Sequence, residues 1–416
     1  MGHVMTNRLA IAGFLAFAAT TAAHAGGLER GGYDIDLLFD PGKFAASAST
    51  TFVMPERKLN NVVDTNAADG IGSDGIGGGA TNGVRESADY LVPRFGFKAG
   101  LGDHFDCLAD YSQPWGAHTN PGNAWMGVNS NIETEINSSN WAATCAYRMG
   151  LGKGQVRFIG GAFYQEVNGF KVRQVAPAFA STGDGTGRLD ISGRGVGWRL
   201  GAAYEIPEIA LRASLLYNSA VNLGDLTGNL DLTQYNGTTL PVFGNTSMPQ
   251  TIEAKVQTGI APGWLAMGSV KWVNWSTLQI VSFCSTAIKA AGLACTYGGP
   301  GYATSMDFLY RDGWTLSGGI GHKFNDQWSG QVGLAWDRGT TTGLSTRTDI
   351  WTLSAGAAFT PAANTEFRLG GALGILTGGS VGPEADANGA LHGTDVSYSF
   401  GNDLIAAVSG SVKVRW

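Results

Sequence analysis

The sequence predicts an all-β protein: a 14-stranded antiparallel transmembrane β-barrel with a short N-terminal hatch, a segment that plugs the lumen. The clearest evidence is segment 397–416, in which apolar and polar residues alternate up to Trp416. Successive side chains of a strand point to opposite faces, so this segment has one apolar and one charged face. Tyr398 and Phe400 at one end of the apolar face, and Trp416 at the other, are typical of a strand that crosses a bilayer.

Composition and charge agree with a barrel. Charged residues make up 14% of the chain, whereas soluble domains contain about 25%. The 63 glycines argue against long helices. The net charge of −6 provides no basic patch, so we expect no nucleic-acid partner.

Residues 1–25 have the features of a signal peptide. Arg8 precedes the apolar run 9–19, and Ala23-His24-Ala25 forms a cleavage signal, so we expect an exported mature chain that starts at Gly26. No later stretch is as long and apolar as a membrane helix. A chain that spans a bilayer without such helices must do so as a closed barrel.

Residues 26–47 are predicted to form the hatch, and residues 48–416 the barrel. Segment 26–47 shows no alternation, but Leu37, Leu38 and Phe39 form an apolar group before the turn at Asp40-Pro41. A disordered tail does not usually carry such a group, so we favour a plug inside the lumen over a tail.

Fourteen strand candidates follow, identified by alternation and by the turns between them. They span 49–60, 90–101, 104–114, 139–149, 155–168, 189–206, 210–218, 250–262, 264–277, 306–323, 327–337, 349–360, 364–377 and 396–416. Short and long connections alternate without a break, and the long ones range from about 11 residues (338–348) to about 31 (219–249). All long loops therefore lie at one end, as in outer-membrane barrels with long extracellular loops.

The charged residues of these strands share one parity. In 189–206, Trp198 and Leu200 oppose Arg199. A charge facing lipid at the midplane costs about 2–4 kcal/mol, so the charged face is expected to face the lumen. Five inward basic residues are candidate partners for a ligand carboxylate: Arg157, Arg199, Arg212, Lys255 and Arg368. The alternative is structural ion pairs with inward acids: Glu166, Glu205, Glu253 and Glu366.

Three motifs occur in a fixed order. They are Tyr111-Ser112-Gln113-Pro114-Trp115-Gly116, then Met248-Pro249 with Trp272-Val273-Asn274-Trp275-Ser276, then the segment from Tyr310 to Gly319. Together with fourteen strands and an N-terminal segment, they resemble the FadL/TodX (OmpP1) family of outer-membrane transport proteins. The family's Asn-Pro-Ala in the hatch corresponds here to Asp40-Pro41-Gly42.

The resemblance implies a function and a location. It implies a protein of the Gram-negative outer membrane that passively takes up long-chain fatty acids or other hydrophobic molecules and releases them sideways. The expected partners are such a ligand and the outer-membrane lipid, and the expected state is a monomer. The residues expected to contact the ligand lie in the hatch and the long loops: Leu37, Leu38, Phe39, Asp40, Pro41, Trp115, Leu226, Leu230 and Phe243.

Two alternative functions belong to other classes. A general diffusion porin for polar solutes would be favoured if the hatch were disordered. A barrel-embedded lipase would use Ser380 of Gly378-Gly379-Ser380-Val381-Gly382 together with His392, but the nucleophile elbow needs a strand-to-helix turn that this loop lacks. We therefore expect no enzyme and no cofactor. The six histidines show no ligand spacing, so we expect no metal.

The four cysteines of an exported chain are expected to pair. Cys284 and Cys295 lie in one long loop, and Cys107 and Cys145 lie on sequential strands with the same lipid-facing parity. We therefore predict disulfides Cys284–Cys295 and Cys107–Cys145. The alternative for the second pair is two free, buried thiols.

Overall fold

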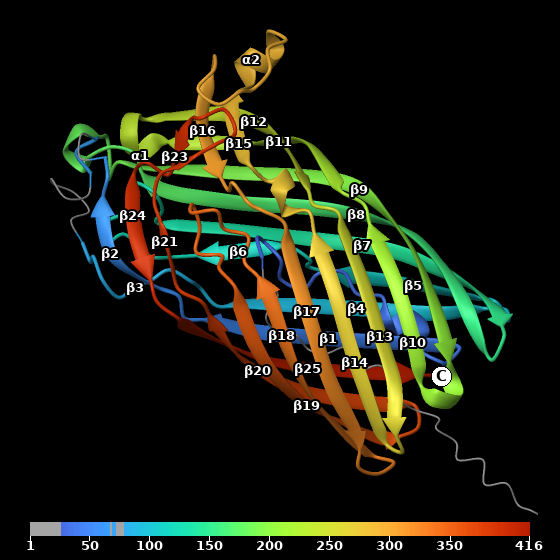
Figure 1. Cartoon of the computed structure of the whole chain (residues 1–416). Helices are drawn as coiled ribbons and strands as arrows, with labels where there is room; N and C mark the ends of the chain where they lie inside the picture. Colours follow the sequence, from blue (N-terminus) through green and yellow to red (C-terminus); the bar gives the residue numbers. More distant parts are fainter. Residues whose placement is uncertain (1–25, 67–68, 72–78) are drawn as a thin grey trace, which may run out of the picture.

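A computed structural model describes residues 26–66, 69–71 and 79–416. The predicted signal peptide lies outside these residues. Fourteen antiparallel strands close into a barrel, and five of them are interrupted and carry two labels (Figure 1). In chain order they are β1 (Phe44–Pro55), β4 (Tyr90–Leu101), β5 with β6 (Phe105–Ser112, Gly116–Thr119), β7 (Glu133–Leu151), β8 (Gly154–Gln174), β9 (Thr186–Ile206), β10 with β11 (Leu211–Asn218, Val221–Leu232), β12 with β13 (Thr238–Met248, Thr251–Ala261), β14 with β15 (Trp264–Val273, Ile280–Ser285), β16 with β17 (Tyr302–Asp307, Gly313–Lys323), β18 (Trp328–Arg338), β19 (Ile350–Ala362), β20 (Thr365–Leu376) and β25 (Asp403–Arg415).

The barrel closes where β1 pairs with β25. The two strands are antiparallel from Ala45 opposite Arg415 to Pro55 opposite Ile405. On its other side β1 pairs with β4. Pairing on both sides of β1 satisfies its backbone groups, which is required of a strand that lies in a bilayer.

Smaller elements gather at the end of the long loops, which we call the loop end (Figure 1). The opposite end, with the short turns and the C-terminus, is the turn end. The smaller elements at the loop end are β2 (Lys58–Asp64), β3 (Val84–Arg85), β21 (Gly379–Val381), β22 (Glu384–Ala385), β23 (Leu391–His392), β24 (Val396–Phe400), α1 (Thr233–Asn236), α2 (Thr286–Ala290) and the 3-10 helix Ala178–Ala180. Three further 3-10 helices lie elsewhere: Asp36–Phe39 precedes β1, Trp275–Thr277 separates β14 from β15, and Pro207–Ile209 forms the short β9–β10 turn at the turn end. No helix in the described part of the chain is long and apolar enough to cross a membrane.

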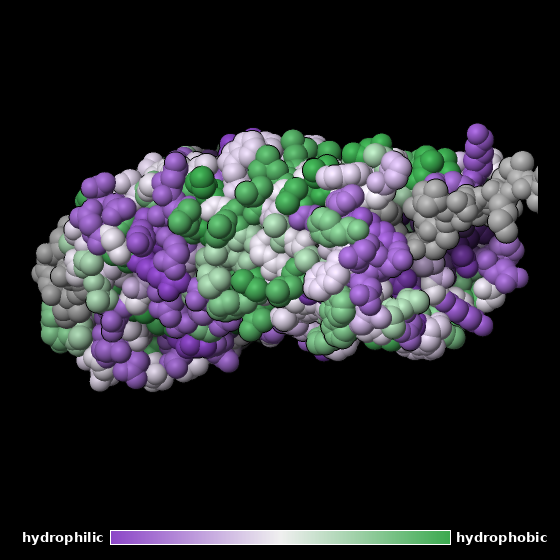
Figure 2. Space-filling view, turned by 90° about the horizontal axis from the view of Figure 1, so that it is seen from below, coloured by the Kyte–Doolittle hydropathy of each residue, from purple (hydrophilic) through white to green (hydrophobic). Residues whose placement is uncertain are grey.

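Two rings of aromatic residues mark a membrane-sized band on the outer surface. Strand register places one ring toward the loop end: Tyr111, Trp141, Tyr164, Trp198, Tyr217, Trp272, Trp314, Trp336 and Trp351. The other ring lies near the turn end: Phe44, Phe97, Phe105, Tyr147, Trp264, Trp328, Phe359 and Trp416. Exposed apolar side chains fill the band between them, and Figure 2 shows hydrophobic residues gathered along the middle of one face. Such rings are typical of membrane interfaces.

Beyond the loop-end ring the long strands continue toward the loop end, and there the two faces exchange character: apolar side chains point inward and polar side chains point outward. Strands β8 and β9 have 21 residues each, whereas crossing a bilayer takes about 9–11. In this extension Val167, Leu189 and Ile191 point inward and are buried, while polar residues point outward. Water surrounds the barrel here, so apolar side chains pack inside the lumen instead of facing lipid.

All fourteen predicted strand positions are confirmed, but several bounds are wrong. The first strand begins at Phe44 and not at 49. Phe44 and Trp416 exchange two backbone hydrogen bonds, since the N–H of each residue donates to the carbonyl of the other at 3.0 Å, and this extends the pairing to Phe44. Residues 44–47, predicted in the hatch, therefore belong to β1. The predicted loop 219–249 holds β11 and β12, and β15 and β16 lie between 278 and 307.

The C-terminal strand is also shorter than predicted. Strand β25 begins at Asp403, and β24 joins a separate sheet at the loop end, with Ser399 opposite Asn60 of β2. The chain turns at Gly401, whose carbonyl accepts a hydrogen bond from Arg57 (2.9 Å). Tyr398 packs near Trp125, with ring centroids 6.2 Å apart, and does not face lipid as predicted.

Cysteine labelling tests the orientation of the barrel. Asn388→Cys lies in a loop-end turn and Asn325→Cys in a turn-end turn, and both positions are exposed. The native cysteines are paired, so they give no background signal. A membrane-impermeant maleimide added to intact cells should label Asn388→Cys and not Asn325→Cys, while both should label after lysis. Equal labelling of the two variants on intact cells would contradict the orientation.

Candidate functional site

Residues 26–40 are largely buried against inward side chains of the barrel, so the segment predicted as a hatch lies in the lumen, with its end at the turn end. Its sequence alternates locally: Tyr33 and Ile35 are buried, while Asp34 and Asp36 point to charged partners. The 3-10 helix that follows buries Leu38 completely, at 0% exposure. Leu38 and Phe39 pack on inward side chains of five barrel strands: Leu108, Ala146, Ile159, Ala203 and Leu216.

Ion pairs connect the hatch acids Asp34 and Asp36 to the barrel wall. Asp36 lies 3.4 Å from Nζ of Lys255 and 3.8 Å from Arg212. Asp34 lies 3.8 Å from Arg94 and 3.9 Å from Lys255. These contacts come from β4, β10 and β13, so they orient the hatch against three separate strands.

The predicted turn residues hold the end of the hatch. The side chain of Asp40 is buried and accepts a hydrogen bond from the N–H of Gly42 (2.9 Å). It also lies 3.5 Å from Nζ of Lys413. Lys98 donates to the carbonyls of Asp40 (3.1 Å) and Gly42 (2.7 Å). Pro41 is exposed.

The inward basic residues predicted to bind a ligand carboxylate all contact protein carboxylates. Arg212 and Lys255 pair with the hatch, and Arg368 pairs with Glu366. Arg157 lies 2.8 Å from Asp106 and 2.5 Å from Glu205. Arg199 differs from these because it is fully buried, its partner Asp110 is 3.8 Å away, and its Nε and Nη2 make no hydrogen bond among the described residues. Of the expected acids, Glu166 lies outside the lumen and bonds to Tyr164.

The barrel wall is broken between β5 and β6, at residues 113–115. Strand β6 pairs with β7 on one edge. On its other edge the hatch bonds near its start, at residues 114–116, and residues 86–88 bond further along, at His118 to Asn120. The N–H of Arg30 donates to the carbonyl of Pro114 (3.0 Å), and the N–H of Gly116 donates to that of Leu28 (2.6 Å). The hatch therefore completes the hydrogen bonding of the wall at the break.

Arg30 fills the gap beside this break. Its guanidinium donates to Oδ1 of Asn137 on β7 (2.7 Å) and lies 4.5 Å from the centre of the Tyr90 ring on β4. The residue is only 5% exposed. Arg30 therefore bridges the two strands that border the gap.

A large apolar cluster lies in the lumen above the hatch. It joins hatch residues Leu28 and Tyr33 to Trp115 at the wall break and to Trp275. Tyr33 meets Trp115 edge-on at 5.5 Å, and Trp115 meets Trp275 at 5.1 Å. Gly27 packs so closely on Trp275 that a Cβ there would lie 2.5 Å from the ring, and its φ of 56° favours glycine.

An open groove of about 190 Å³ leads into this cluster from the loop end. Its apolar lining comes from β8, β9, β11, α1 and β16 and their connections: Val175, Leu189, Leu230, Leu232, Tyr235 and Ala303. Two cations, Lys171 and Arg173, line the same groove. Burial, and next the charge of Arg173, lower the pKa of Lys171 to about 8. An apolar groove with cations at one side suits an amphiphile with an anionic head group.

The predicted loop residues fall into two groups. Trp115, Leu226 and Leu230 belong to the apolar cluster, and all three are buried. Leu226 and Leu230 lie on β11 and not in a loop. Phe243 on β12 is outside the cluster and lies beside Lys289 of α2, at 5.4 Å. Sequence reasoning missed Arg30, Lys171 and Arg173, which have no distinguishing local pattern.

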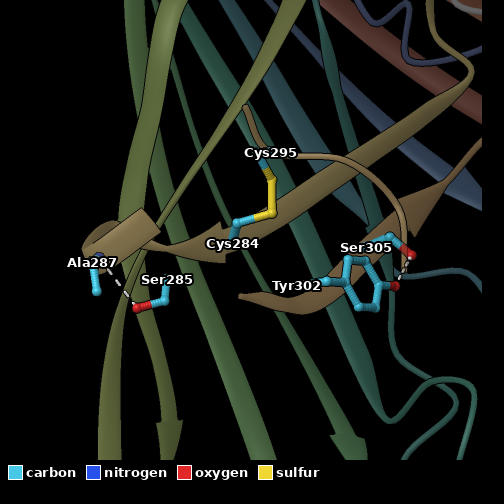
Figure 3. The surroundings of a disulfide bond; sticks show 6 residues. All are labelled: Cys284, Ser285, Ala287, Cys295, Tyr302 and Ser305. Carbon is cyan, nitrogen blue, oxygen red and sulfur yellow. Dashed lines mark hydrogen bonds between the residues drawn. A yellow bond between two sulfur atoms is a disulfide. The ribbon is translucent and has the colours of Figure 1, made fainter. Parts of the chain in front are cut away.

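The lipase interpretation finds no geometric support. Ser380 on β21 pairs in register with Ser399, while His392 contacts Asp307 and Asp386, so the described residues form no Ser–His pair. Among the same residues, no group of three or more His, Cys, Asp or Glu could hold a metal ion. Both predicted disulfides are confirmed, and Figure 3 shows Cys284–Cys295.

Comparison with known proteins gives a consistent result. Residues 38–373 match the family described as outer membrane protein transport protein (OMPP1/FadL/TodX). The long-chain fatty acid transport protein of Escherichia coli (strain K12) is 24% identical over 387 residues, which covers 78% of this chain and 82% of that protein.

Two solved structures share the fold. A Pseudomonas aeruginosa FadL homologue has a TM-score of 0.69 at 17% identity, covering 94% of this chain and 96% of that chain. The Pseudomonas putida toluene transporter TodX has a TM-score of 0.59 at 15% identity, covering 95% and 97%.

Truncating Leu38 tests how the hatch is held. Leu38→Ala should weaken hatch docking by about 2–5 kcal/mol, because a fully buried side chain is lost. Hydrogen exchange followed by mass spectrometry should then show faster exchange in 26–43, with little change in the barrel strands. The control is Leu37→Ala, since Leu37 is only partly buried and should change exchange much less. Equal effects of the two variants would contradict the packing described here.

Proposed function

The chain belongs to the OMPP1/FadL/TodX family of outer membrane transport proteins, and on this premise we propose that it is a passive uptake channel for hydrophobic small molecules, with a hatch that gates lateral release. The protein lies in the outer membrane of a Gram-negative cell, and its family transports and does not catalyse. The proposed ligands are of the long-chain fatty acid or aromatic hydrocarbon type. The proposed working unit is a monomer surrounded by outer-membrane lipid.

The observation that carries this proposal is the continuity of the apolar cluster. Leu189 and Leu230 line the loop-end groove and also belong to the cluster. Trp115 belongs to the same cluster and lies in the wall break. A hydrophobic molecule therefore has an apolar path from the outside to a gap in the barrel wall, so it can stay out of water along the way.

The wall break is the proposed exit. Backbone groups of Pro114 and Gly116 bond to the hatch, so a small movement of the hatch would free both the gap and the apolar surface behind it. Below the hatch the lumen is crossed by charged residues that pair with one another, such as Arg157 with Asp106 and Glu205. A hydrophobic molecule would pay a large desolvation cost to pass these charges, so lateral exit is favoured over passage through the lumen.

The ordered hatch also supports transport over the diffusion porin. A barrel of fourteen strands is wider than one that wall side chains alone can fill. Here the hatch occupies the lumen and buries Tyr33, Leu38 and Phe39 in it. A porin for polar solutes needs a hydrated channel, and this arrangement opposes one.

A disulfide lock tests whether the hatch must move. A Cβ at Gly31 would lie 2.8 Å from Cγ1 of Val92 on β4, so Gly31→Cys with Val92→Cys should tie the hatch to the wall. Uptake of a hydrophobic probe into liposomes should fall to background in the oxidised double variant and recover on reduction with dithiothreitol.

The matched control pair is Ser269→Cys with Ser317→Cys. These hydroxyls lie 2.7 Å apart on the neighbouring wall strands β14 and β17, so this bond joins wall to wall, does not tie the hatch, and should leave uptake unchanged. Wild-type protein treated with dithiothreitol controls for the native disulfides. Wild-type uptake by the oxidised hatch lock would refute hatch-gated release.

Lys171 tests the polar end of the groove. Lys171→Met should weaken binding of dodecanoic acid about tenfold, because a hydrogen bond to a charged group contributes about 1.5–3 kcal/mol. Binding of dodecanol should change little.

The pKa of Lys171 is lowered to about 8, so its ammonium form persists below that pH and is lost above it. Wild-type preference for the acid should therefore decline as pH rises through 8, measured by titration calorimetry.

An exposed lysine at the turn end provides the control. Lys153→Met removes the same charge far from the groove and should leave both ligands unaffected. Equal loss of acid and alcohol binding in Lys171→Met would instead indicate a structural role for Lys171, and a groove suited to uncharged hydrocarbons.

A further inference from the structure

Residues 386–395, which we call the strap, connect the two walls of the loop-end groove. His392 of the strap contacts Asp307 at the end of β16, with Nδ1 3.1 Å from Oδ2. Asp395 of the strap lies 3.4 Å from Nη1 of Arg173 on β8. Both β8 and β16 line the groove. The strap therefore joins opposite sides of the groove through one contact at each side.

His392 lies between two carboxylates that belong to different segments. Its ring is only 1% exposed. Besides the contact with Asp307, its Nε2 lies 3.5 Å from Oδ2 of Asp386, on the β22–β23 hairpin. The ring of Tyr297 covers it at 4.6 Å, and Tyr297 follows the Cys284–Cys295 disulfide shown in Figure 3.

The number of hydrogen bonds that His392 can donate depends on its charge. A neutral imidazole has one N–H and can donate to one of the two carboxylates, whereas an imidazolium can donate to both. Asp386 is held as a carboxylate by its turn: the N–H groups of Ala390 and Asn388 donate to it, and these bonds keep its pKa below the usual range.

Carboxylates outnumber cations around the strap. Besides Asp386, the acids are Asp307, Asp395 and Glu384, which lies opposite His392 in the β22–β23 pair, and the cations are Arg173 and Lys171. Tyr297 and Tyr302 are also near. The β8 contact pairs an arginine with a carboxylate, whereas the β16 contact uses a histidine, the side-chain type that changes charge near neutral pH. A pH-dependent contact is therefore expected on the β16 side.

We propose that His392 is a proton-controlled latch that fastens the strap across the groove. Protonation lets the ring donate to Asp307 and Asp386 at once and makes both contacts charge-assisted, which holds the hairpin to β16. Deprotonation leaves a single N–H for the two carboxylates and weakens the contact with β16. Ligand entry is then slower in acidic surroundings than at neutral pH. The latch itself is a property of the loops, and only its effect on entry rests on the proposed function of the groove.

Hydrogen exchange of the intact protein in detergent tests the latch without any ligand. After correction for intrinsic exchange rates, amides of 386–395 in the wild type should exchange about tenfold more slowly at pH 5.5 than at pH 7.5, the effect of one charge-assisted hydrogen bond. His392→Gln should abolish this difference. His104→Gln, at the exposed turn end, should keep it.

A second variant guards against misfolding of His392→Gln. Asp386→Asn keeps Oδ1, which accepts the turn hydrogen bonds, and removes the carboxylate that faces His392. It should also lose the pH difference. Wild-type exchange that is equal at the two pH values, or a difference that persists in both variants, overturns the latch whatever the protein transports.

The association rate of N-phenyl-1-naphthylamine, a probe uncharged at both pH values, then tests the effect on the groove. The rate should be lower at pH 5.5 than at pH 7.5 in the wild type and equal in His392→Gln. Equal wild-type rates, with normal pH-dependent exchange of the strap, overturn the control of entry but leave the latch standing.

Discussion

The pairing of every backbone group inside the bilayer is the constraint on which this structure depends. An unpaired group in hydrocarbon costs several kcal/mol, so a membrane sheet must close on itself. The β1–β25 seam meets this requirement along its whole length. The break at residues 113–115 lies beside the loop-end aromatic ring, and there Leu28 and Arg30 of the hatch provide backbone partners that the wall lacks. The hatch is thus part of the wall as well as a plug, which couples its position to the integrity of the gap.

The reversal of polarity along each strand divides the barrel into two environments. Within the membrane band the outside is apolar and the lumen carries ion pairs such as Lys98 with Asp106, 2.7 Å apart. Above the band the outside is polar, and the lumen holds the apolar cluster around Trp115 and Trp275. The same strands therefore form an apolar lumen at the loop end and a lumen crossed by ion pairs within the membrane band. The hatch lies at the boundary, where Tyr33 faces the cluster and Asp36 faces the charges.

Sequence reasoning predicted the fold well because alternation against a bilayer is a strong, repeated signal. It fails where that signal reverses: β11, whose Leu226 and Leu230 point inward, lies in the predicted loop 219–249. The hatch pattern from Tyr33 to Asp36 spans too few residues to be recognised. Arg30 depends on Asn137, and His392 on Asp307, contacts between residues far apart in the chain. Such roles follow from tertiary structure and leave no local trace in the sequence.

The lipid-facing disulfide constrains how the protein is made. Cys107 and Cys145 share the outward parity of Trp141 and Tyr147, so their sulfurs lie against acyl chains in the mature protein. Thiol oxidation proceeds through the thiolate, which forms in water and not in hydrocarbon. The bond must therefore form in the periplasm, before the barrel enters the membrane. Strands β5 and β7 consequently meet while the chain is still in transit, which makes this hairpin an early step in assembly.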